Sequence, residues 1–224
     1  IDKILENCNW DIEYGYQQLK IKIGRSGKWY SHADGMKMDI EVIKQINNAF
    51  PNITLLVDSN DKYTLQDTIN FLKGIGDIPL LWVEEPFRED YEEGKKLRKW
   101  MDENGFKNTL YADGEANRDH QLCLRMGKED IMNVYLADIR SFGFTRWRQL
   151  MSELKSYGML ASPHAFGSML KTHYITHVAA AFGNIVTIEG VTCLSDDVDF
   201  GNYKIINGKI SVSDEPGFGM KLLK

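Results

Sequence analysis

Short apolar runs alternate with amphipathic stretches along almost the whole chain. The run 80–84 (Leu-Leu-Trp-Val-Glu) begins with four consecutive apolar residues, which indicates a strand buried on both faces of a sheet. Stretches with apolar residues at helical spacing separate such runs. The pattern predicts strands at 19–23, 53–58, 80–84, 109–112, 132–136, 159–162 and 185–189, and helices at 1–14, 39–50, 65–75, 91–104, 118–126, 146–157 and 167–182.

This regular alternation predicts an α/β fold with a parallel sheet covered by helices. Seven strands are best explained by an eight-stranded (β/α) barrel that lacks its first strand. A doubly wound open sheet is the alternative, but no GxGxxG follows any predicted strand. We expect a barrel over 1–190 and a turn-rich segment over 191–224, where Asn207-Gly208 between two apolar runs predicts a hairpin.

Carboxylates end three consecutive predicted strands, about 25 to 30 residues apart. Asp58 and Glu84 close their runs, and Glu115 follows the next one, with Glu85 and Asp113 as neighbouring alternatives. The carboxyl ends of parallel strands meet at one edge of a sheet, so these acids should lie together. Like charges in one place repel unless a cation neutralises them. The spacing therefore predicts a site for a hard divalent ion, and Mg²⁺ is the expected one.

Basic side chains are expected near the same edge. Lys20 and Lys22 share one face of the run 19–23, opposite its apolar residues, because side chains alternate along a strand. In a closed barrel both lysines point inward toward the carboxylates; on an exposed edge strand they point into water. His164 follows the run 159–162, where a barrel presents functional groups, although a lone histidine is often structural.

Composition and charge narrow the function classes. The chain has 224 residues and a formal net charge of −5, which argues against nucleic acid as a partner. Its three cysteines, Cys8, Cys123 and Cys193, fall in no CxxC pattern, which favours a reducing cytoplasm over a disulfide framework. No apolar run approaches the roughly 18 residues of a membrane span. We therefore expect a globular cytoplasmic protein that binds a small molecule.

Six short motifs follow one another in chain order: Lys20-Ile-Lys22-Ile-Gly24, Val57-Asp-Ser-Asn60, Trp82-Val-Glu-Glu-Pro86, Asp113-Gly-Glu115, Ser162-Pro-His164 and Pro216-Gly-Phe-Gly219. Together they resemble the enolase superfamily, specifically its mandelate racemase/muconate lactonizing enzyme branch and the mandelate racemase subgroup with its acid-sugar dehydratases. This resemblance implies a TIM-like (β/α)7β barrel preceded by an N-terminal capping domain. We expect that this domain and the first strand lie outside the given sequence and that 191–224 would pack on the domain.

The resemblance also implies roles for individual residues. Asp58, Glu84 and Glu115 would bind Mg²⁺, in agreement with the choice made from spacing. Lys22 would be the base on one face of the substrate, with Lys20 beside it near the substrate carboxylate.

Further residues follow from the same comparison of motifs. His164 would be the acid or base on the other face, while Asn60 and Glu189 would contact the substrate. The family pairs this histidine with an aspartate; counting back from Gly143 puts Ala137 at that position, with Asp138 next to it. The sequence therefore leaves open whether Asp138 pairs with His164. Phe142 also replaces a usual glycine.

The activity implied by the resemblance is removal of the proton α to a carboxylate through an enediolate, with Mg²⁺ stabilising the charge. Dehydration of a sugar acid to a 2-keto-3-deoxy acid is the leading hypothesis. A racemase, epimerase or cycloisomerase of a hydroxy or sugar acid is the second, and a non-catalytic metal-binding member is the third. The expected partners are a small carboxylate substrate and identical chains in an oligomer, with no nucleic acid and no membrane.

Overall fold

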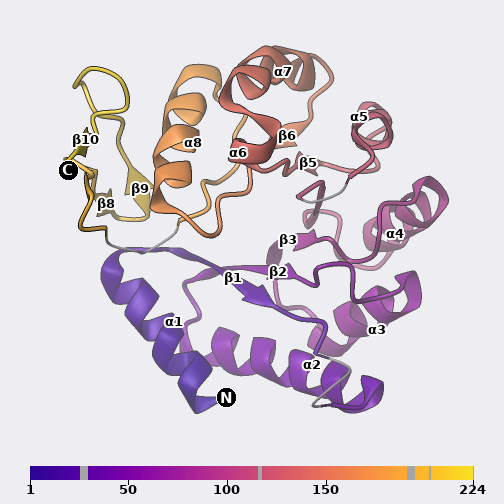
Figure 1. Ribbon diagram of the computed structural model, residues 1–224. Helices are drawn as coiled ribbons and strands as arrows, with labels where there is room; N and C mark the ends of the chain where they lie inside the picture. The colour runs from indigo at the N-terminus through magenta and orange to yellow at the C-terminus, as the bar shows by residue number, and fades with distance from the viewer. Residues whose placement is uncertain (26–29, 116–117, 191–194, 202, 224) are drawn as a thin grey trace. The chain divides into compact units, whose positions relative to one another are not determined.

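The computed structural model describes residues 1–25, 30–115, 118–190, 195–201 and 203–223 (Figure 1). The chain divides into two compact units, Ile1–Asp113 and Gly114–Lys224. Among the residues described, no helix is both long enough and apolar enough to span a bilayer. Cys193 and residues 26–29, which come between the predicted strand at 19–23 and the predicted helix at 39–50, lie outside the described residues.

The first unit contains four helices that alternate with four parallel strands in the order β1-β2-β3-β4. Successive helices contact one another and form a layer beside the strands (Figure 1). This confirms the predicted alternation for the first half of the chain. The elements are α1 (Asp2–Tyr14), β1 (Gln18–Lys22), α2 (His32–Ala49), β2 (Thr54–Asp58), α3 (Leu65–Ile75), β3 (Leu80–Glu84), α4 (Tyr91–Glu103) and β4 (Leu110–Asp113).

The strand register in this unit brings the predicted site residues to one level. Lys22 on β1 pairs with Asp58 on β2, and Asp58 in turn pairs with Glu84 on β3. Glu84 is level with Ala112, next to the end of β4. All four strands are parallel, so their carboxyl ends lie at the same edge of the sheet.

The core of this unit lies between the sheet and its helices. Leu19 and Ile21 of β1 and Ile23 just beyond it are buried, while the lysines between them are not, as the period of two predicts. Helices α2, α3 and α4 contribute the other half of this core. Their fully buried apolar side chains are Val42, Ile43, Ile46, Phe71, Leu72, Leu97 and Met101.

Helix α2 begins at His32, seven residues before the predicted start at residue 39, because a capping residue fixes its end. Ser31 is the N-cap, and its hydroxyl accepts a hydrogen bond from the backbone N–H of Asp34 at 3.1 Å. The next helix, α3, has a capping box between Thr64 and Asp67. The weak apolar pattern of the first turn of α2 concealed the earlier start.

The second unit has shorter strands and a different arrangement. β5 and β6 are parallel, and helices α7 and α8 contact each other beside α6 (Figure 1). The residues before β7 include α5 (His120–Lys128), β5 (Val134–Tyr135), α6 (Ile139–Phe142), α7 (Phe144–Ser156), β6 (Leu160–Ala161) and α8 (Met169–Phe182). Strands β7 (Val198–Asp199) and β10 (Lys221–Leu222) pair antiparallel. Asn207 and Gly208, both with positive φ, join β8 (Ile205–Ile206) to β9 (Lys209–Ile210) as the predicted hairpin.

The prediction of a strand over 185–189 is wrong. Only Ile185 forms a bridge, to Ala161, and no longer ladder follows. Pro163 has no N–H to continue a ladder, and the Ser162 hydroxyl instead donates to the carbonyl of Thr187 at 2.9 Å. Side-chain contacts therefore replace backbone pairing along this stretch.

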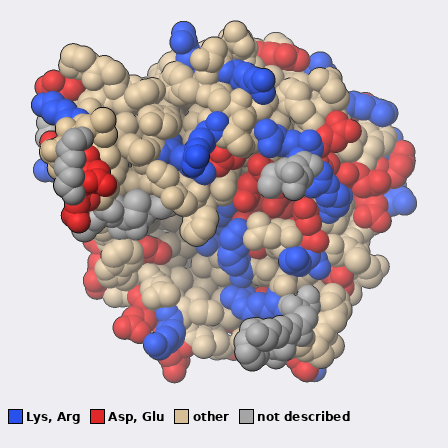
Figure 2. All heavy atoms as spheres, in the orientation of Figure 1, with Lys and Arg blue, Asp and Glu red and all other residues tan. Residues whose placement is uncertain are grey.

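Charged side chains of both signs are interspersed over the face shown in Figure 2. Both signs occur on this face, and the chain as a whole carries a formal net charge of −5.

Phe71 tests the packing of the first unit. Its side chain is 0% exposed and lies 5.9 Å from the ring of Tyr63. We expect Phe71→Ala to lower the free energy of unfolding by about 3–5 kcal/mol, because the substitution leaves a cavity in a closed core. Urea unfolding followed by circular dichroism measures the loss. Trp10→Ala, at a side chain 53% exposed on α1, is the control; equal losses in the two variants would contradict this account of the core.

Candidate functional site

Two lysines and two carboxylates form a compact group at the carboxyl ends of β1, β2 and β3. Nζ of Lys20 lies 2.7 Å from Oε1 of Glu84 and 3.2 Å from Oδ2 of Asp58. Nζ of Lys22 donates to the same Oδ2 of Asp58 and, at 2.9 Å, to Oδ1 of Asn60. The structure therefore brings together five predicted site residues of the first unit and places both lysines on the carboxylate side of the strand.

The charges in this group depend on one another. Asp58 is fully buried, and burial alone would raise the pKa of its carboxyl group. The ammonium groups of Lys20 and Lys22 outweigh that effect and hold the pKa of Asp58 below its ordinary value. Lys22 keeps 55% of its side chain exposed, whereas Lys20 keeps 20%. Lys22 is thus the lysine that a dissolved molecule reaches more readily.

Both carboxylates are held in orientation by neighbouring donors. The indole N–H of Trp82 donates to Oε2 of Glu84 at 2.9 Å, and the backbone N–H of Asn60 donates to Oδ1 of Asp58 at 3.0 Å. Each carboxylate thus has one oxygen oriented by a neutral donor and one facing a lysine. Carboxylate oxygens are among the ligands that Mg²⁺ prefers, and here they are held in fixed orientations.

The alternative acids have different surroundings. Asp113 is enclosed within the first unit, and burial followed by the nearby charge of Glu85 raises the pKa of Asp113 well above its ordinary value. Its Oδ2 accepts a hydrogen bond from the hydroxyl of Tyr111 at 2.9 Å. A carboxyl group that resists ionisation is a poor cation ligand. These surroundings favour Glu115 over Asp113 as the acid that follows β4.

Gly114 explains the spacing of the Asp113-Gly-Glu115 motif. Its φ is +107°, which L-residues with a side chain rarely adopt, and an added Cβ would lie 2.7 Å from the ring of Tyr135. The chain therefore turns sharply between the two acids. This turn directs Glu115 into the second unit while Asp113 remains the last residue of β4.

A second group of predicted site residues surrounds His164 in the second unit. Nδ1 of His164 lies 2.9 Å from Oδ2 of Asp138, and Nε2 lies 3.2 Å from Oε1 of Glu115. The residue paired with the histidine is therefore Asp138 and not Ala137, which is buried. An ionised carboxylate can only accept hydrogen bonds, so an N–H at Nδ1 donates to Asp138, while Nε2 faces a second carboxylate, that of Glu115.

Lys171 also belongs to this group, although the sequence analysis does not predict it as a site residue. Nζ of Lys171 donates to Oδ2 of Asp138 at 2.6 Å and to the carbonyl of Phe166 at 3.0 Å. Backbone N–H groups of Arg140 and Ser141 donate to the other oxygen of Asp138. Burial would raise the pKa of Asp138, but these donors, led by Lys171, lower it to about 2. A lysine in the first turn of a predicted outer helix gives no sequence signal of such a contact.

Glu189 has a structural role that the sequence did not indicate. Its Oε2 accepts hydrogen bonds from the backbone N–H groups of Ala165 and Phe166, the latter at 3.0 Å. The same oxygen lies 3.9 Å from Nε2 of His164. Glu189 therefore fixes the loop that follows His164, and its predicted contact with a substrate stays a prediction.

Two histidines on α8 pack against the C-terminal segment. His173 is fully buried, which lowers its pKa to about 4, and its ring centroid lies 3.9 Å from that of Tyr203. Nε2 of His177 lies 2.7 Å from the hydroxyl of the same tyrosine. The pair holds a tyrosine in place, as expected for packing residues on an outer helix.

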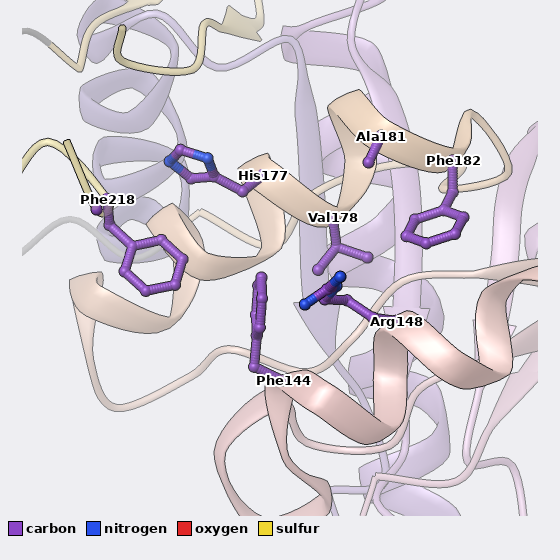
Figure 3. Close-up of a pocket in the computed structure, with 8 residues that line it drawn as sticks. Phe144, Arg148, His177, Val178, Ala181, Phe182 and Phe218 are labelled. Carbon is purple, nitrogen blue, oxygen red and sulfur yellow. The ribbon is translucent and has the colours of Figure 1, made fainter. Parts of the chain in front are cut away.

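Two cavities occur among the described residues of the second unit. One, of about 670 Å³, adjoins the His164 group; the other, of about 350 Å³, lies between α7, α8 and the segment around Phe218 (Figure 3). The second is lined mainly by apolar side chains such as Phe144 and Val178, with Arg148 beside them. The larger cavity is lined by Glu115, Arg118, His120, Asp138, Ser141, Phe142, Arg146 and His164.

Comparison with known protein families identifies a single match over nearly the whole chain. The family described as enolase C-terminal domain-like matches residues 4–224. Among curated relatives, an o-succinylbenzoate synthase of Bacillus subtilis is 28% identical over 99% of this chain and 57% of its own length. A D-gluconate/D-galactonate dehydratase of Picrophilus torridus is 24% identical over 98% of this chain and 56% of its own length. The chain thus spans little more than half the length of these relatives.

Solved structures show the same fold. Galacturonate dehydratase from a Geobacillus species, in a complex with D-galacturonate and 5-keto-4-deoxy-D-galacturonate, is 30% identical with a TM-score of 0.92. The match covers all of this chain and 60% of that one. A mutant of the same enzyme complexed with Mg has a TM-score of 0.91 at 30% identity, covering 99% of this chain and 57% of that one.

Acid titration tests the contacts of Asp138. Because its folded-state pKa of about 2 lies below the ordinary value of 3.8, ionised Asp138 stabilises the fold above about pH 4. This contribution disappears as the pH falls through about 2. We therefore expect Asp138→Asn to lower the melting temperature at pH 7 and the difference from the wild type to shrink below pH 4. Asp2→Asn, at an exposed residue, is the control; a difference for Asp138→Asn that is the same at all pH values would refute the assignment.

Proposed function

Because this chain belongs to the enolase C-terminal domain-like family, we propose that it is the barrel part of a Mg²⁺-dependent enzyme that dehydrates a sugar acid to a 2-keto-3-deoxy acid. The reaction begins with removal of the proton α to the substrate carboxylate and continues with loss of the β-hydroxyl as water, which leaves an enol that tautomerises to the 2-keto-3-deoxy acid. In this proposal residues 1–190 form the catalytic barrel, and 191–224 contact a capping domain supplied by a longer chain.

Asp58, Glu84 and Glu115 are the proposed Mg²⁺ ligands. Asp58 and Glu84 are paired at the ends of neighbouring strands, and Glu115 comes two residues after the end of the next strand, β4. All three supply carboxylate oxygens, which suit a hard divalent ion. Bound Mg²⁺ would supply positive charge that stabilises the substrate carboxylate while the α carbon loses its proton.

Lys22 is the proposed base, and Lys20 is its partner. Lys22 in its neutral amine form takes the α proton, and its greater exposure suits contact with a substrate. The less exposed Lys20, which already contacts both carboxylates, places a fixed positive charge beside the developing enediolate. Asn60, which accepts a hydrogen bond from Lys22, holds the amine in position.

His164 is the proposed acid for the departing hydroxyl. Asp138 fixes the ring by accepting from Nδ1, which leaves Nε2 to exchange a proton with the substrate. As the acid, His164 begins as an imidazolium, which the carboxylate of Asp138 stabilises, and it becomes neutral when Nε2 gives its proton to the departing hydroxyl. Glu189 holds the loop beyond His164 through its backbone contacts and is the proposed ligand of the substrate carboxylate.

The single observation that carries the proposal is the group of two lysines on two paired carboxylates at the ends of β1, β2 and β3. A merely structural ion-pair network does not need two lysines at one buried carboxylate oxygen. The His164–Asp138 contact gives specific support to a second candidate, a racemase or epimerase, because a second proton donor could return the α proton on the other face.

A test of the proposal is proton NMR in D₂O with the full-length protein, Mg²⁺ and a panel of sugar acids. We expect a 2-keto-3-deoxy product from at least one acid. Deuterium at the α carbon without loss of water would replace the dehydratase with a racemase or epimerase. Absence of both reactions across the panel would leave the non-catalytic metal-binding alternative.

Substitution of the proposed base gives a second test. Lys22→Met should slow exchange of the α proton by about 10²–10⁴-fold, because the remaining amine, Lys20, is less exposed and is held by both carboxylates. Lys99→Met is the matched control, since the Lys99 side chain is 75% exposed on the surface of α4. An unchanged rate in Lys22→Met, with the control also unchanged, would show that Lys22 is not the base.

A further inference from the structure

Two arginines line the cavity of about 670 Å³ beside His164. Arg118 precedes α5, and Arg146 lies in the first turn of α7, so separate elements bring them to one cavity. Glu115, Asp138 and His164 line the same cavity. The cavity thus combines proposed reacting groups with guanidinium groups that the proposed reaction does not use.

Contacts hold Arg118 in place before any ligand binds. Its Nε donates to the hydroxyl of Tyr135 at 3.0 Å, and one terminal nitrogen donates to the backbone carbonyl of Glu115 at 3.3 Å. The guanidinium carbon lies 5.4 Å above the ring of Phe142. The ring of Phe142 provides the surface on which Arg118 rests.

Among the described residues, no ion pair joins either guanidinium group to a carboxylate, although Glu115 and Asp138 line the same cavity. His120, which contacts the hydroxyl of Tyr135 at 2.9 Å, has a lowered pKa, mainly because of burial and then because of Arg118. Arg146 acts in the same direction, while Asp119 and Glu153 oppose it.

We propose that Arg118 and Arg146 bind a second carboxylate, at the end of the substrate far from the reacting carbon, so that the preferred substrate is a dicarboxylic sugar acid. This inference rests on the proposed function, because the reacting end of the substrate is placed by the groups described above. The inference adds the class of substrate, a dicarboxylic sugar acid, which the groups at the reacting end do not determine.

Guanidinium chemistry supports a carboxylate over a hydroxyl at this position. Arginine presents paired N–H donors that match the two oxygens of a carboxylate, and such charge-assisted pairs are stronger than hydrogen bonds to a neutral hydroxyl. A held guanidinium loses little conformational entropy on binding. A cavity of this size also has room for the carbon chain of a sugar acid beside the arginines.

The experiment compares two substrates of one configuration, an aldonic acid and the corresponding aldaric acid, which differ only in a terminal hydroxymethyl or carboxylate group. The full-length enzyme with Mg²⁺ should have the higher kcat/KM for the aldaric acid. Arg118→Gln should lower kcat/KM for the aldaric acid by about 10- to 100-fold, mostly through KM, and change that for the aldonic acid by less than about threefold. Arg118→Lys should restore part of the loss.

Arg146→Gln and Arg148→Gln form a matched pair on α7. Arg146 lines this cavity, whereas Arg148 lines the separate cavity in Figure 3, so only the first should weaken discrimination between the two acids. Melting temperatures show which variants remain folded, and Arg146→Gln tests the proposal even if Arg118→Gln does not fold. Equal losses on both acids, or no loss on the aldaric acid, would overturn it.

Failure of the proposed function is a separate outcome. Calorimetric binding of a dicarboxylic sugar acid in the presence of Mg²⁺ does not require turnover. If no acid reacts, weaker binding in Arg118→Gln but not in Arg148→Gln still supports the second-carboxylate site. Equal binding by the wild type and Arg118→Gln would overturn the site even if the dehydratase activity is found.

Discussion

The structure depends most on the neutralisation of charge at the carboxyl ends of β1, β2 and β3. Parallel pairing in register places Asp58 beside Glu84, both nearly free of solvent, and two such carboxylates repel unless positive charge lies between them. Lys20 and Lys22 supply that charge from the neighbouring strand. A divalent cation would neutralise the same two carboxylates. The same group of acids can therefore contact two lysines and also serve as ligands of Mg²⁺.

Much of this group could be predicted from the sequence because strands obey simple rules. The period of two placed both lysines on one face of β1, and the position of each acid at the end of an apolar run placed Asp58 and Glu84 at one edge. The predicted alternation of strands and helices is confirmed over the first unit. These features depend on local pattern, which a single sequence contains.

Other features depend on contacts between distant residues, which a single sequence does not contain. Lys171 lies on the side of a helix and reaches Asp138, 33 positions earlier, and no pattern indicates that contact. Counting back from Gly143 assigned the partner position of His164 to Ala137, but the residue that contacts His164 is Asp138. The local backbone conformation decides which side chain faces the histidine, and a residue count does not contain it. The apolar pattern of 185–189 predicts a strand. Its pairing with the segment around Ala161 nevertheless ends after one bridge, because Pro163 lacks an N–H and the Ser162 hydroxyl takes the next carbonyl.

The second unit contains both the proposed acid, His164, and the two arginines proposed to select the substrate. The His164–Asp138 pair and the two arginines line one cavity, and the ring of Phe142 lies beneath the guanidinium group of Arg118. The proposed acid and the proposed site for a second carboxylate therefore share one cavity.

The most direct measurement is a crystal structure of the full-length protein with Mn²⁺ in place of Mg²⁺, with the metal located by anomalous scattering. The account predicts one strong peak within coordination distance of oxygens from Asp58, Glu84 and Glu115, with Lys22 moved away from Oδ2 of Asp58. A peak bound by other residues, or no peak while both lysines remain on Asp58, would contradict it.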